Sequence, residues 1–523
     1  MTRAASPPRR PNIVLILLDD MGFSDIGCYG AEIGTPNLDG LAERGVRHTQ
    51  FYNCARCCPT RASALTGLYP HQAGIGYMEP TNRYNKGLMD NRPTPQYQGF
   101  LNRNCVTIAE VLRTAGYQTL MTGKWHVGGG EGQRPLQRGF DRYYGIIGGA
   151  CNYWRPGGKT LRHGDEPVTN LPGDFYTTDY FTRYAVRFIE EADPGRPFFL
   201  YVAYNAPHWP LHAWPEDIVR YAGNYTKGWD ELRENRLARQ KRLGLFGRGL
   251  KLSPRDEESY PWEDEPDKQR MDLKMAVYAA MIDRVDQGVG HLLDALRRKG
   301  IEKNTLIMFL SDNGGCAEPL GREKEDEPGP EDSYVGYLLP WANASNTPFR
   351  LFKHWVHEGG IATPFIACWP DAIGGGALNR RQIGHVKDIM PTCLEAAGAE
   401  YPETFQGNAI RPLEGKSLLH SLLDPRSARN EPVYWEHEGN RAIRDGRWKL
   451  TCYYNEDHEF NVGTGKRTGR WELYDIQADR TELSNSAETQ PGVVRGLLAR
   501  YEAWEERVGV LDWEAVMKAA GFS

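Results

Sequence analysis

Two pairs of hard oxygen ligands stand out in the sequence, each directly behind a short apolar run. Asp19-Asp20 follows Ile13–Leu18, and Asp312-Asn313 follows Leu306–Leu310. Carboxylate and amide oxygens suit Ca²⁺ or Mg²⁺ rather than Zn²⁺. A single carboxylate of this kind is more often a helix cap or a turn residue, but two pairs in equivalent positions predict a divalent-metal site.

Side chains that carry positive charge or transfer protons stand in similar positions. They are Lys124, His126, His208 and Lys353. The first two follow the apolar run Tyr117–Met121, and His208 follows Phe198–Tyr204. Each alone would usually be a solvated lysine or a hydrogen-bonded structural histidine. Together they indicate a site for an anionic substrate.

The segment Cys57-Cys58-Pro59-Thr60-Arg61 places a cysteine at a predicted helix start. Pro59 suits the first turn, which puts Cys57 just ahead of the N-terminus, where unpaired N–H groups favour anions. A buried structural thiol is the plain alternative. Cys54 and Cys57 also have the spacing of a redox or zinc pair, but no second Cys/His pair at zinc spacing lies nearby, which disfavours zinc.

These residues need a scaffold that brings their loops together, and the apolar runs predict one. Their near-continuous apolar character is typical of strands buried on both faces, and a further run spans Pro364–Cys368. A helical pattern covers Met275–Lys299 between two of the runs. Alternating strands and helices predict an α/β fold with a doubly wound, mainly parallel sheet. Ligand sites in such sheets form outside the carboxyl ends of the strands, so the polar clusters should meet in one crevice.

The pattern changes beyond about residue 424, and we predict two domains, residues 1–424 and 425–523. Short strand candidates replace the longer runs, at Val433–Glu436, Ala442–Arg444, Trp448–Tyr453 and Trp471–Ile476. Asp445-Gly446 is a strong two-residue hairpin signal, and a helical pattern covers Val493–Trp504. The second domain should therefore be a small antiparallel sheet packed by a terminal helix.

Composition excludes several classes of protein. The 523 residues contain 63 Lys and Arg against 68 Asp and Glu, a formal net charge of −5, so no basic field favours nucleic acid. No stretch approaches the roughly 20 apolar residues of a membrane span, and no signal peptide is recognised. Ten scattered cysteines are too sparse for a disulfide scaffold. We expect a cytoplasmic protein that does not bind membranes.

The segment around Cys57 resembles the signature of type I sulfatases, in which this Cys is oxidised to Cα-formylglycine after synthesis. The signature here continues from Arg61 to Leu65-Thr66-Gly67. Other segments are similar to sulfatase segments in family order, at residues 11–20, 34–39, 123–126, 206–210, 311–314, 353–360 and 472–475. The resemblance covers nearly the whole chain and is strongest to bacterial arylsulfatases.

This resemblance implies an alkaline-phosphatase-like fold and a sulfuric ester hydrolase that acts on sulfate monoesters, most of all aryl sulfates. It implies one Ca²⁺, or Mg²⁺, per chain, with ligands from Asp19, Asp20, Asp312, Asn313 and residue 57. Hydrated formylglycine would attack sulfur with one oxygen, and its second oxygen would later release sulfate as the aldehyde reforms. Asp312 would accept a proton.

The other roles are carried over in the same way. Arg61 would hold the diol and the metal-bound carboxylates, and Lys124 and Lys353 would bind sulfate oxygens. His208 would protonate the leaving group, with Lys353 sharing this role, and His126 would take the hemiacetal proton. A formylglycine-generating enzyme is the implied partner in maturation.

One departure from the family is Leu68, where many sulfatases carry Arg or Lys, so a polar contact beneath the aldehyde is expected to be missing. The neighbouring Cys58 is expected to pack rather than react. Aromatic residues near the loops could line an apolar leaving-group pocket, although aromatic side chains there usually serve packing. They are Tyr153, Trp154, Trp209, Trp341 and Trp355.

Other functions remain open at this stage. A phosphonate monoester or phosphodiester hydrolase of the same superfamily is the nearest, because some of its members also use formylglycine. A catalytically silent metal-binding protein or a thiol redox protein using Cys54 and Cys57 would belong to other classes. The sequence does not give the natural substrate or the oligomeric state.

Overall fold

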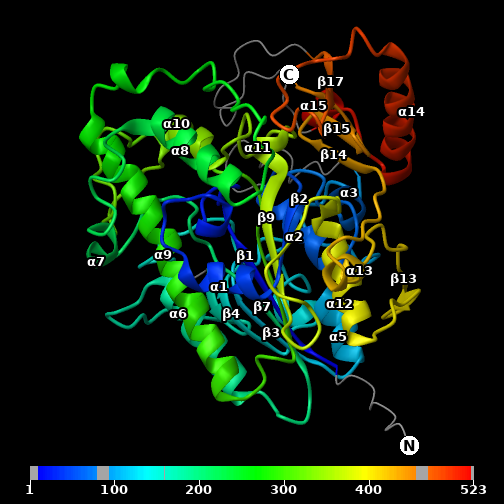
Figure 1. Cartoon of the computed structure of the whole chain (residues 1–523). Coiled ribbons are helices and arrows are strands. Elements are labelled where there is room, and N and C mark those ends of the chain that lie inside the picture. The colour runs from blue at the N-terminus through cyan, green and yellow to red at the C-terminus, as the bar shows by residue number, and fades with distance from the viewer. Residues whose placement is uncertain (1–9, 79–93, 158–159, 455–468, 520–523) are drawn as a thin grey trace, which may run out of the picture.

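A large, mixed sheet forms the centre of the computed structural model, which describes residues 10–78, 94–157, 160–454 and 469–519 (Figure 1). Its strands run in the order β10-β2-β9-β8-β1-β7-β3-β4-β5-β6, with β11 also paired to β2. The strands are β1 (Asn12–Leu18), β2 (Val46–Tyr52), β3 (Gln118–Gly123), β4 (Arg142–Ile146), β5 (Leu161–His163), β6 (Glu166–Pro167), β7 (Phe198–Ala203), β8 (Thr305–Ser311), β9 (Ala362–Cys368), β10 (Ala377–Asn379) and β11 (Gly384–His385). The central block from β8 to β4 is parallel, as predicted.

Strand β1 shows why the middle of the sheet is apolar on both faces. Val14 and Ile16 pack into one core cluster with the helices of one layer, whereas Ile13 and Leu15 pack into a second cluster on the opposite face. Successive side chains of a strand point to opposite faces, so a strand covered on both sides needs a continuous apolar run.

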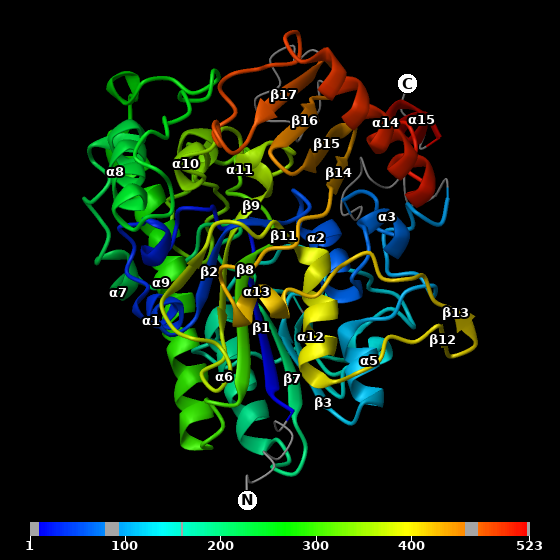
Figure 2. The same cartoon turned by 45° about the vertical axis from the view of Figure 1, so that its right-hand side comes forward.

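Helices cover both faces of the sheet (Figures 1 and 2). The helices are α1 (Pro36–Arg44), α2 (Cys57–Thr66), α3 (Pro70–Ala73), α5 (Ile108–Thr114), α6 (Thr177–Glu191), α7 (Pro215–Ile218), α8 (Gly228–Arg242), α9 (Lys268–Arg298), α10 (Leu338–Ser345), α11 (Glu358–Ile361), α12 (Ile389–Ala397) and α13 (Leu419–Leu423). The longest, α9, starts earlier than its apolar pattern predicts, because the Asp267 side chain caps it by accepting from the backbone N–H of Arg270.

A second, four-stranded antiparallel sheet lies near the C-terminus, with the order β14-β15-β16-β17. These strands are β14 (Val433–His437), β15 (Asn440–Asp445), β16 (Trp448–Cys452) and β17 (Trp471–Asp475), and α14 (Pro491–Val508) packs against them. The predicted hairpin at Asp445-Gly446 joins β15 to β16. Two short strands, Thr404–Phe405 and Asn408–Ala409, form a separate hairpin, and α15 covers Trp513–Ala519.

The large sheet has more strands than the five apolar runs predicted, because β2, β4, β5, β6, β10 and β11 were not expected. Strand β2 was not predicted, because its sequence VRHTQFY mixes polar residues into an apolar pattern. Strand β9 was predicted but pairs antiparallel with both β8 and β2, so the sheet is parallel only in its central part. No helix among the described residues is both long and apolar enough to cross a membrane.

Candidate active site

The polar segments that follow β1, β3, β7 and β8 meet at the carboxyl ends of these strands. Asp19 and Asp20 directly follow β1, and Asp312 and Asn313 directly follow β8. Strands β1 and β8 are parallel neighbours in the sheet. The backbone N–H of Asp20 donates to Asp312 Oδ1 at 3.2 Å, and Asn313 Nδ2 donates to Asp20 Oδ1 at 2.7 Å. Parallel pairing in register therefore places four oxygen-bearing side chains together.

Each of the three carboxylates carries its own cation. Lys124 Nζ lies 2.6 Å from Asp19 Oδ2, and Lys353 Nζ lies 2.9 Å from Asp20 Oδ2. Arg61 binds Asp312 Oδ2 through Nε at 3.0 Å and Nη2 at 2.6 Å. All of these side chains are at least 97% buried, which makes the ion pairs mutually dependent, since an unpaired buried charge is costly.

Cys57 lies inside this group of charges. Its sulfur and the carboxylates of Asp19 and Asp312 offer ligand atoms that all lie within 4.8 Å of one another. The thiol is fully buried, and burial raises its pKa although Lys124 and Lys353 act in the opposite direction. Cys57 is the first residue of α2, one position further into the helix than predicted, and Arg56 is the N-cap.

Two histidines complete the set predicted from the sequence. His208 Nε2 lies 3.5 Å from Asp20 Oδ2, and its Nδ1 is 2.7 Å from the Trp209 carbonyl oxygen. Burial lowers the pKa of His208 to about 4 in spite of the Asp20 carboxylate, so the ring is neutral at pH 7. His126 is fully buried against Gly149, where a Cβ atom would stand 2.5 Å from its ring.

The charges of the site shift the pKa values of its carboxylates in opposite directions. Burial and the charge of Asp19 raise the pKa of Asp312 to about 7, although Arg61 opposes them. Burial would also raise the pKa of Asp20, but His208 and Lys353 outweigh it and lower that pKa to about 2. Asp20 and His126 also have left-handed backbones, with φ of 67° and 55°, a strained conformation that is common at functional sites.

Two buried oxygen atoms among the predicted metal ligands have no hydrogen-bond partner. They are Asp19 Oδ1 and Asn313 Oδ1. Buried acceptors are normally satisfied, so two orphans on neighbouring loops need an explanation. Their hard donor set fits a divalent cation of the Ca²⁺ or Mg²⁺ type.

The structure adds a charged wall that the sequence analysis missed. Arg56 Nη1 contacts Glu318 Oε1 at 2.7 Å, and the same oxygen lies 3.8 Å from Lys353 Nζ. Glu318 Oε2 also accepts from Trp209 Nε1 at 2.9 Å. Arg56 was recognisable as the neighbour of Cys57, but Glu318 lies in the irregular acidic segment after β8, where no periodic pattern marks it.

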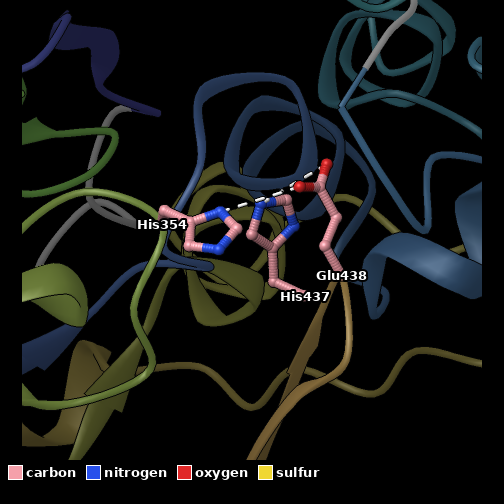
Figure 3. A group of neighbouring side chains, drawn as sticks. All are labelled: His354, His437 and Glu438. Carbon is pink, nitrogen blue, oxygen red and sulfur yellow. Dashed lines mark ion pairs between the residues drawn. The ribbon is translucent and has the colours of Figure 1, made fainter. Parts of the chain in front are cut away.

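A second missed group lies beside this wall and consists of His354, His437 and Glu438 (Figure 3). Glu438 Oε2 is 3.6 Å from His354 Nδ1, and Glu438 Oε1 is 3.8 Å from His437 Nε2. Asn440 Nδ2 donates to His354 Nε2 at 3.1 Å, which leaves the ring proton on Nδ1, facing the carboxylate. In this tautomer Nδ1 has no lone pair for a metal.

Glu438 connects this group to Cys57. It accepts from the backbone N–H of Met78 at 3.3 Å, and Met78 Sδ lies 3.9 Å from Cys57 Sγ. Cys58 Sγ lies 3.7 Å from the same Met78 Sδ. Leu68 is fully buried in the same core cluster as Ala62 and Leu65 of α2.

Most of the aromatic residues near the loops serve packing, the more usual role. Trp341 and Trp355 are buried in the core, and the Tyr153 hydroxyl donates to the carbonyl oxygens of Asn205 and His208. Trp154 packs against Tyr176, His212 and Trp214. Trp209 lies against the His208 ring, with the ring centroids 4.4 Å apart in a tilted arrangement.

Comparisons with known proteins agree with this geometry. A family model described as Sulfatase matches residues 11–399, and one described as the C-terminal part of N-sulphoglucosamine sulphohydrolase matches residues 349–493. The chain is 35% identical to an arylsulfatase of Klebsiella aerogenes over 82% of this chain and 94% of that protein. It is 33% identical to an uncharacterized sulfatase of Schizosaccharomyces pombe over 96% and 95%, respectively.

Among solved structures, Ps i-CgsB superposes with a TM-score of 0.68 at 26% identity, covering 95% of this chain and 93% of that one. The same protein has been solved in complex with k-i-k-neocarrahexaose.

Proposed function

The chain belongs to the sulfatase family and hydrolyses sulfate esters, and on this premise we propose that residue 57 becomes its formylglycine nucleophile, with aryl sulfates as preferred substrates. The observation that carries the proposal is the position of Cys57. Its sulfur lies within 4.8 Å of a carboxylate oxygen of Asp19 and of a carboxylate oxygen of Asp312. The similarity to an arylsulfatase supports the substrate class.

We propose one Ca²⁺, or Mg²⁺, held by Asp19, Asp20, Asp312 and Asn313, with residue 57 beside it. The two orphaned oxygens support the assignment, because a hard divalent cation would satisfy both of them. When bound, the cation supplies charge that orients the nucleophile, lowers its pKa and stabilises a sulfate oxygen.

The chain's own residues divide the remaining work. Arg61 orients Asp312 through two hydrogen bonds and lies next to residue 57, so it positions both the nucleophile and the carboxylate that accepts its proton. Lys124 and Lys353 lie on either side of the carboxylates and bind the sulfate oxygens. Once oxidised and hydrated, residue 57 supplies one oxygen that attacks sulfur and a second that releases sulfate.

His208 protonates the leaving oxygen, with Lys353 beside it. Because burial keeps the free His208 neutral, the negative charge of a bound sulfate ester is what favours its protonated form. His126 accepts the proton of the second oxygen when sulfate leaves, and its position beside Lys124 and His208 supports this role.

The test begins with the mass of the peptide that contains position 57, from protein made together with a formylglycine-generating enzyme. We expect the aldehyde at residue 57. The metal-loaded protein should then cleave nitrophenyl sulfate with a higher kcat/KM than the matching phosphate monoester, phosphodiester and phenylphosphonate. A higher value for the diester or phosphonate would replace the proposal with the alternative hydrolase.

We also propose a reducing, cytoplasmic location. All ten cysteines are free thiols in the structure, which supports a reducing compartment. Fractionation of the source cells with an antibody against the protein would test this location.

A further inference from the structure

A cavity of about 500 Å³ lies away from the active site, between the C-terminal sheet and the loops beside α8 and β11. Its walls include the β15–β16 turn at Gly446, the segment after α8 at Leu250, and the residues just before β11 at Arg381. The other end of β15 follows Glu438, which lies beside the active-site wall. Since β15 spans six residues, the two places are roughly 20 Å apart.

The lining of this cavity is strongly basic. It contains four arginines, Arg380, Arg381, Arg444 and Arg480, and no Asp or Glu among the described residues. Arg380 and Arg381 are exposed and form no ion pair with a described carboxylate. Arg444 and Arg480 are 99% and 93% buried. The cavity thus has two exposed cations at its edge, of which Arg380 donates to the Gly244 carbonyl oxygen, and two buried cations in its wall.

The fixed arginines belong to a buried group that we term the C-terminal ion cluster: Glu358, Arg444, Lys449, Arg480 and Glu482. Lys449 Nζ lies 3.1 Å from Glu358 Oε1 and 2.8 Å from Glu482 Oε1, and Arg480 Nε donates to Glu358 Oε2 at 2.6 Å. Arg444 contacts only neutral partners, the Tyr52 hydroxyl and the Gln50 side chain.

This cluster therefore has three cations against two carboxylates, an excess of one buried positive charge. Arg480 Nη2 is buried and has no hydrogen-bond partner. Burial lowers the pKa of Arg444, and the neighbouring Arg480 adds to this effect. A buried, incompletely paired guanidinium is costly, so the pair of arginines needs one more acceptor from the cavity.

We propose that the cavity is a binding site for a tetrahedral oxyanion, a sulfate or phosphate group held between Arg444 and Arg480 and contacted by Arg380 and Arg381. The guanidinium group matches such an oxyanion in geometry and charge. The volume also admits an anion carried on a larger molecule. Binding here does not depend on the hydrolytic site and does not require substrate turnover.

Binding at this site would stabilise the junction of the two sheets. Arg444 contacts Tyr52, the last residue of β2, and Arg480 contacts Glu358, the first residue of α11. Strand β2 leads into the segment that contains Cys57, and α11 follows the segment that contains Lys353. A bound oxyanion would hold the C-terminal sheet against the segments that carry both residues.

Crystals soaked in sodium selenate test the site directly, because selenium in this sulfate analogue gives an anomalous signal. We expect a peak within hydrogen-bond distance of Arg444 and Arg480, separate from any peak near Lys124 and Lys353. A peak only in the active site, or no peak at all under these conditions, would overturn the proposal.

Thermal unfolding in solution separates this site from general salt effects. Low-millimolar sulfate or phosphate should raise Tm more than sodium chloride of equal ionic strength, because the ligand binds only the folded state. The exposed double variant Arg380→Ala/Arg381→Ala should lose at least half of this increase, whereas Arg426→Ala, a neighbouring exposed arginine outside the cavity, should keep it. Equal increases in both variants would contradict the proposal.

Comparing the anions identifies the source. A similar response to sulfate, phosphate and glucose 6-phosphate would show recognition of the oxyanion group, whether free or esterified. A response to the free ions alone would restrict the site to inorganic anions. Unchanged hydrolysis of nitrophenyl sulfate in the double variant would confirm that the cavity and the active site are independent.

Discussion

The active site and the C-terminal ion cluster are both buried networks of opposite charges, but they leave different atoms unpaired. In the active site three carboxylates meet three cations, and the orphaned atoms are acceptors, Asp19 Oδ1 and Asn313 Oδ1. In the C-terminal ion cluster two carboxylates meet three cations. Arg480 Nη2 is a donor with neither a hydrogen bond nor an ion pair, whereas Glu482 Oε1, which also has no hydrogen bond, is ion-paired with Lys449 at 2.8 Å.

This difference teaches how to interpret buried charge. Buried acceptors without a donor can be satisfied by a bound cation, and a buried donor without an acceptor can be satisfied by a bound anion, because each buried polar group needs a partner. In these two networks the type of the unpaired atom therefore indicates the class of ligand.

The largest effect is expected at residue 57, because the active site contains a nucleophile and the C-terminal ion cluster does not. Cys57→Ala should lower kcat/KM for nitrophenyl sulfate by roughly 10⁴-fold or more, since the variant has no nucleophile. Cys58→Ala is the matched control, because this neighbouring thiol packs against Met78 and the Tyr77 carbonyl oxygen. Activity that persists in Cys57→Ala would exclude the formylglycine mechanism.

The next effect concerns the divalent cation proposed for the active site. Asp312→Asn should reduce bound Ca²⁺ or Mg²⁺ from about one per chain to a small fraction and lower kcat on the order of 10³-fold. Elemental analysis and steady-state kinetics measure the two changes. Full metal content in the variant, or stoichiometric zinc in the wild type, would show that the donor set was assigned wrongly.

His208 should show an effect that depends on the substrate. A nitrophenoxide leaves without a proton, whereas an alkoxide needs one, so His208→Ala should lose on the order of 10²-fold to 10³-fold on an alkyl sulfate. On nitrophenyl sulfate the loss should stay below about tenfold. Equal losses on the two esters would mean that His208 only positions the sulfate.

In the C-terminal ion cluster the expected effect is on stability rather than on rate. Lys449→Met removes the cation shared by Glu358 and Glu482 and should lower the free energy of unfolding by about 3–5 kcal/mol. Urea denaturation measures this change. The control Lys227→Met removes an exposed pair with Glu231 and should change the free energy by less than about 1 kcal/mol.

The smallest effect is expected from a buried residue outside both networks. His212 Nδ1 accepts from the Tyr153 backbone N–H at 3.4 Å and its Nε2 faces the Ser333 carbonyl, an arrangement that requires the neutral ring. Burial lowers its folded pKa to about 4, so the unfolded chain binds a proton first as pH falls. Stability should therefore decrease between about pH 6.5 and pH 4, by up to about 3 kcal/mol from this group.

His212→Gln tests that assignment, because glutamine does not titrate. The variant should show a shallower loss of the free energy of unfolding over the same pH interval, whatever its stability at pH 7. An unchanged slope would assign the acid sensitivity to other buried histidines, such as His48, whose pKa burial lowers to about 3.

The sequence by itself determined the central strands and the loops that carry the site. Apolar runs such as those of β1 and β8 have one stable use, burial on both faces of a sheet, and parallel strands end at the same edge. Asp19, Asp312 and Lys124 were therefore predictable as neighbours without coordinates. The segment at Cys57 indicated the family by its residue order.

Only the tertiary structure decided which atoms meet. Glu318 and Glu438 lie in an irregular segment and a tight turn, where sequence patterns carry no periodic signal, yet folding brings them to Arg56 and Met78 beside Cys57. Most of the aromatic residues near the loops serve packing, and the guanidinium groups of Arg444 and Arg480, ordinary in sequence, both lie against the ring of Tyr52. Long-range charge balance and the pairing of single atoms depend on distances across the fold, and these distances are set by how the sheets pack rather than by local residue order.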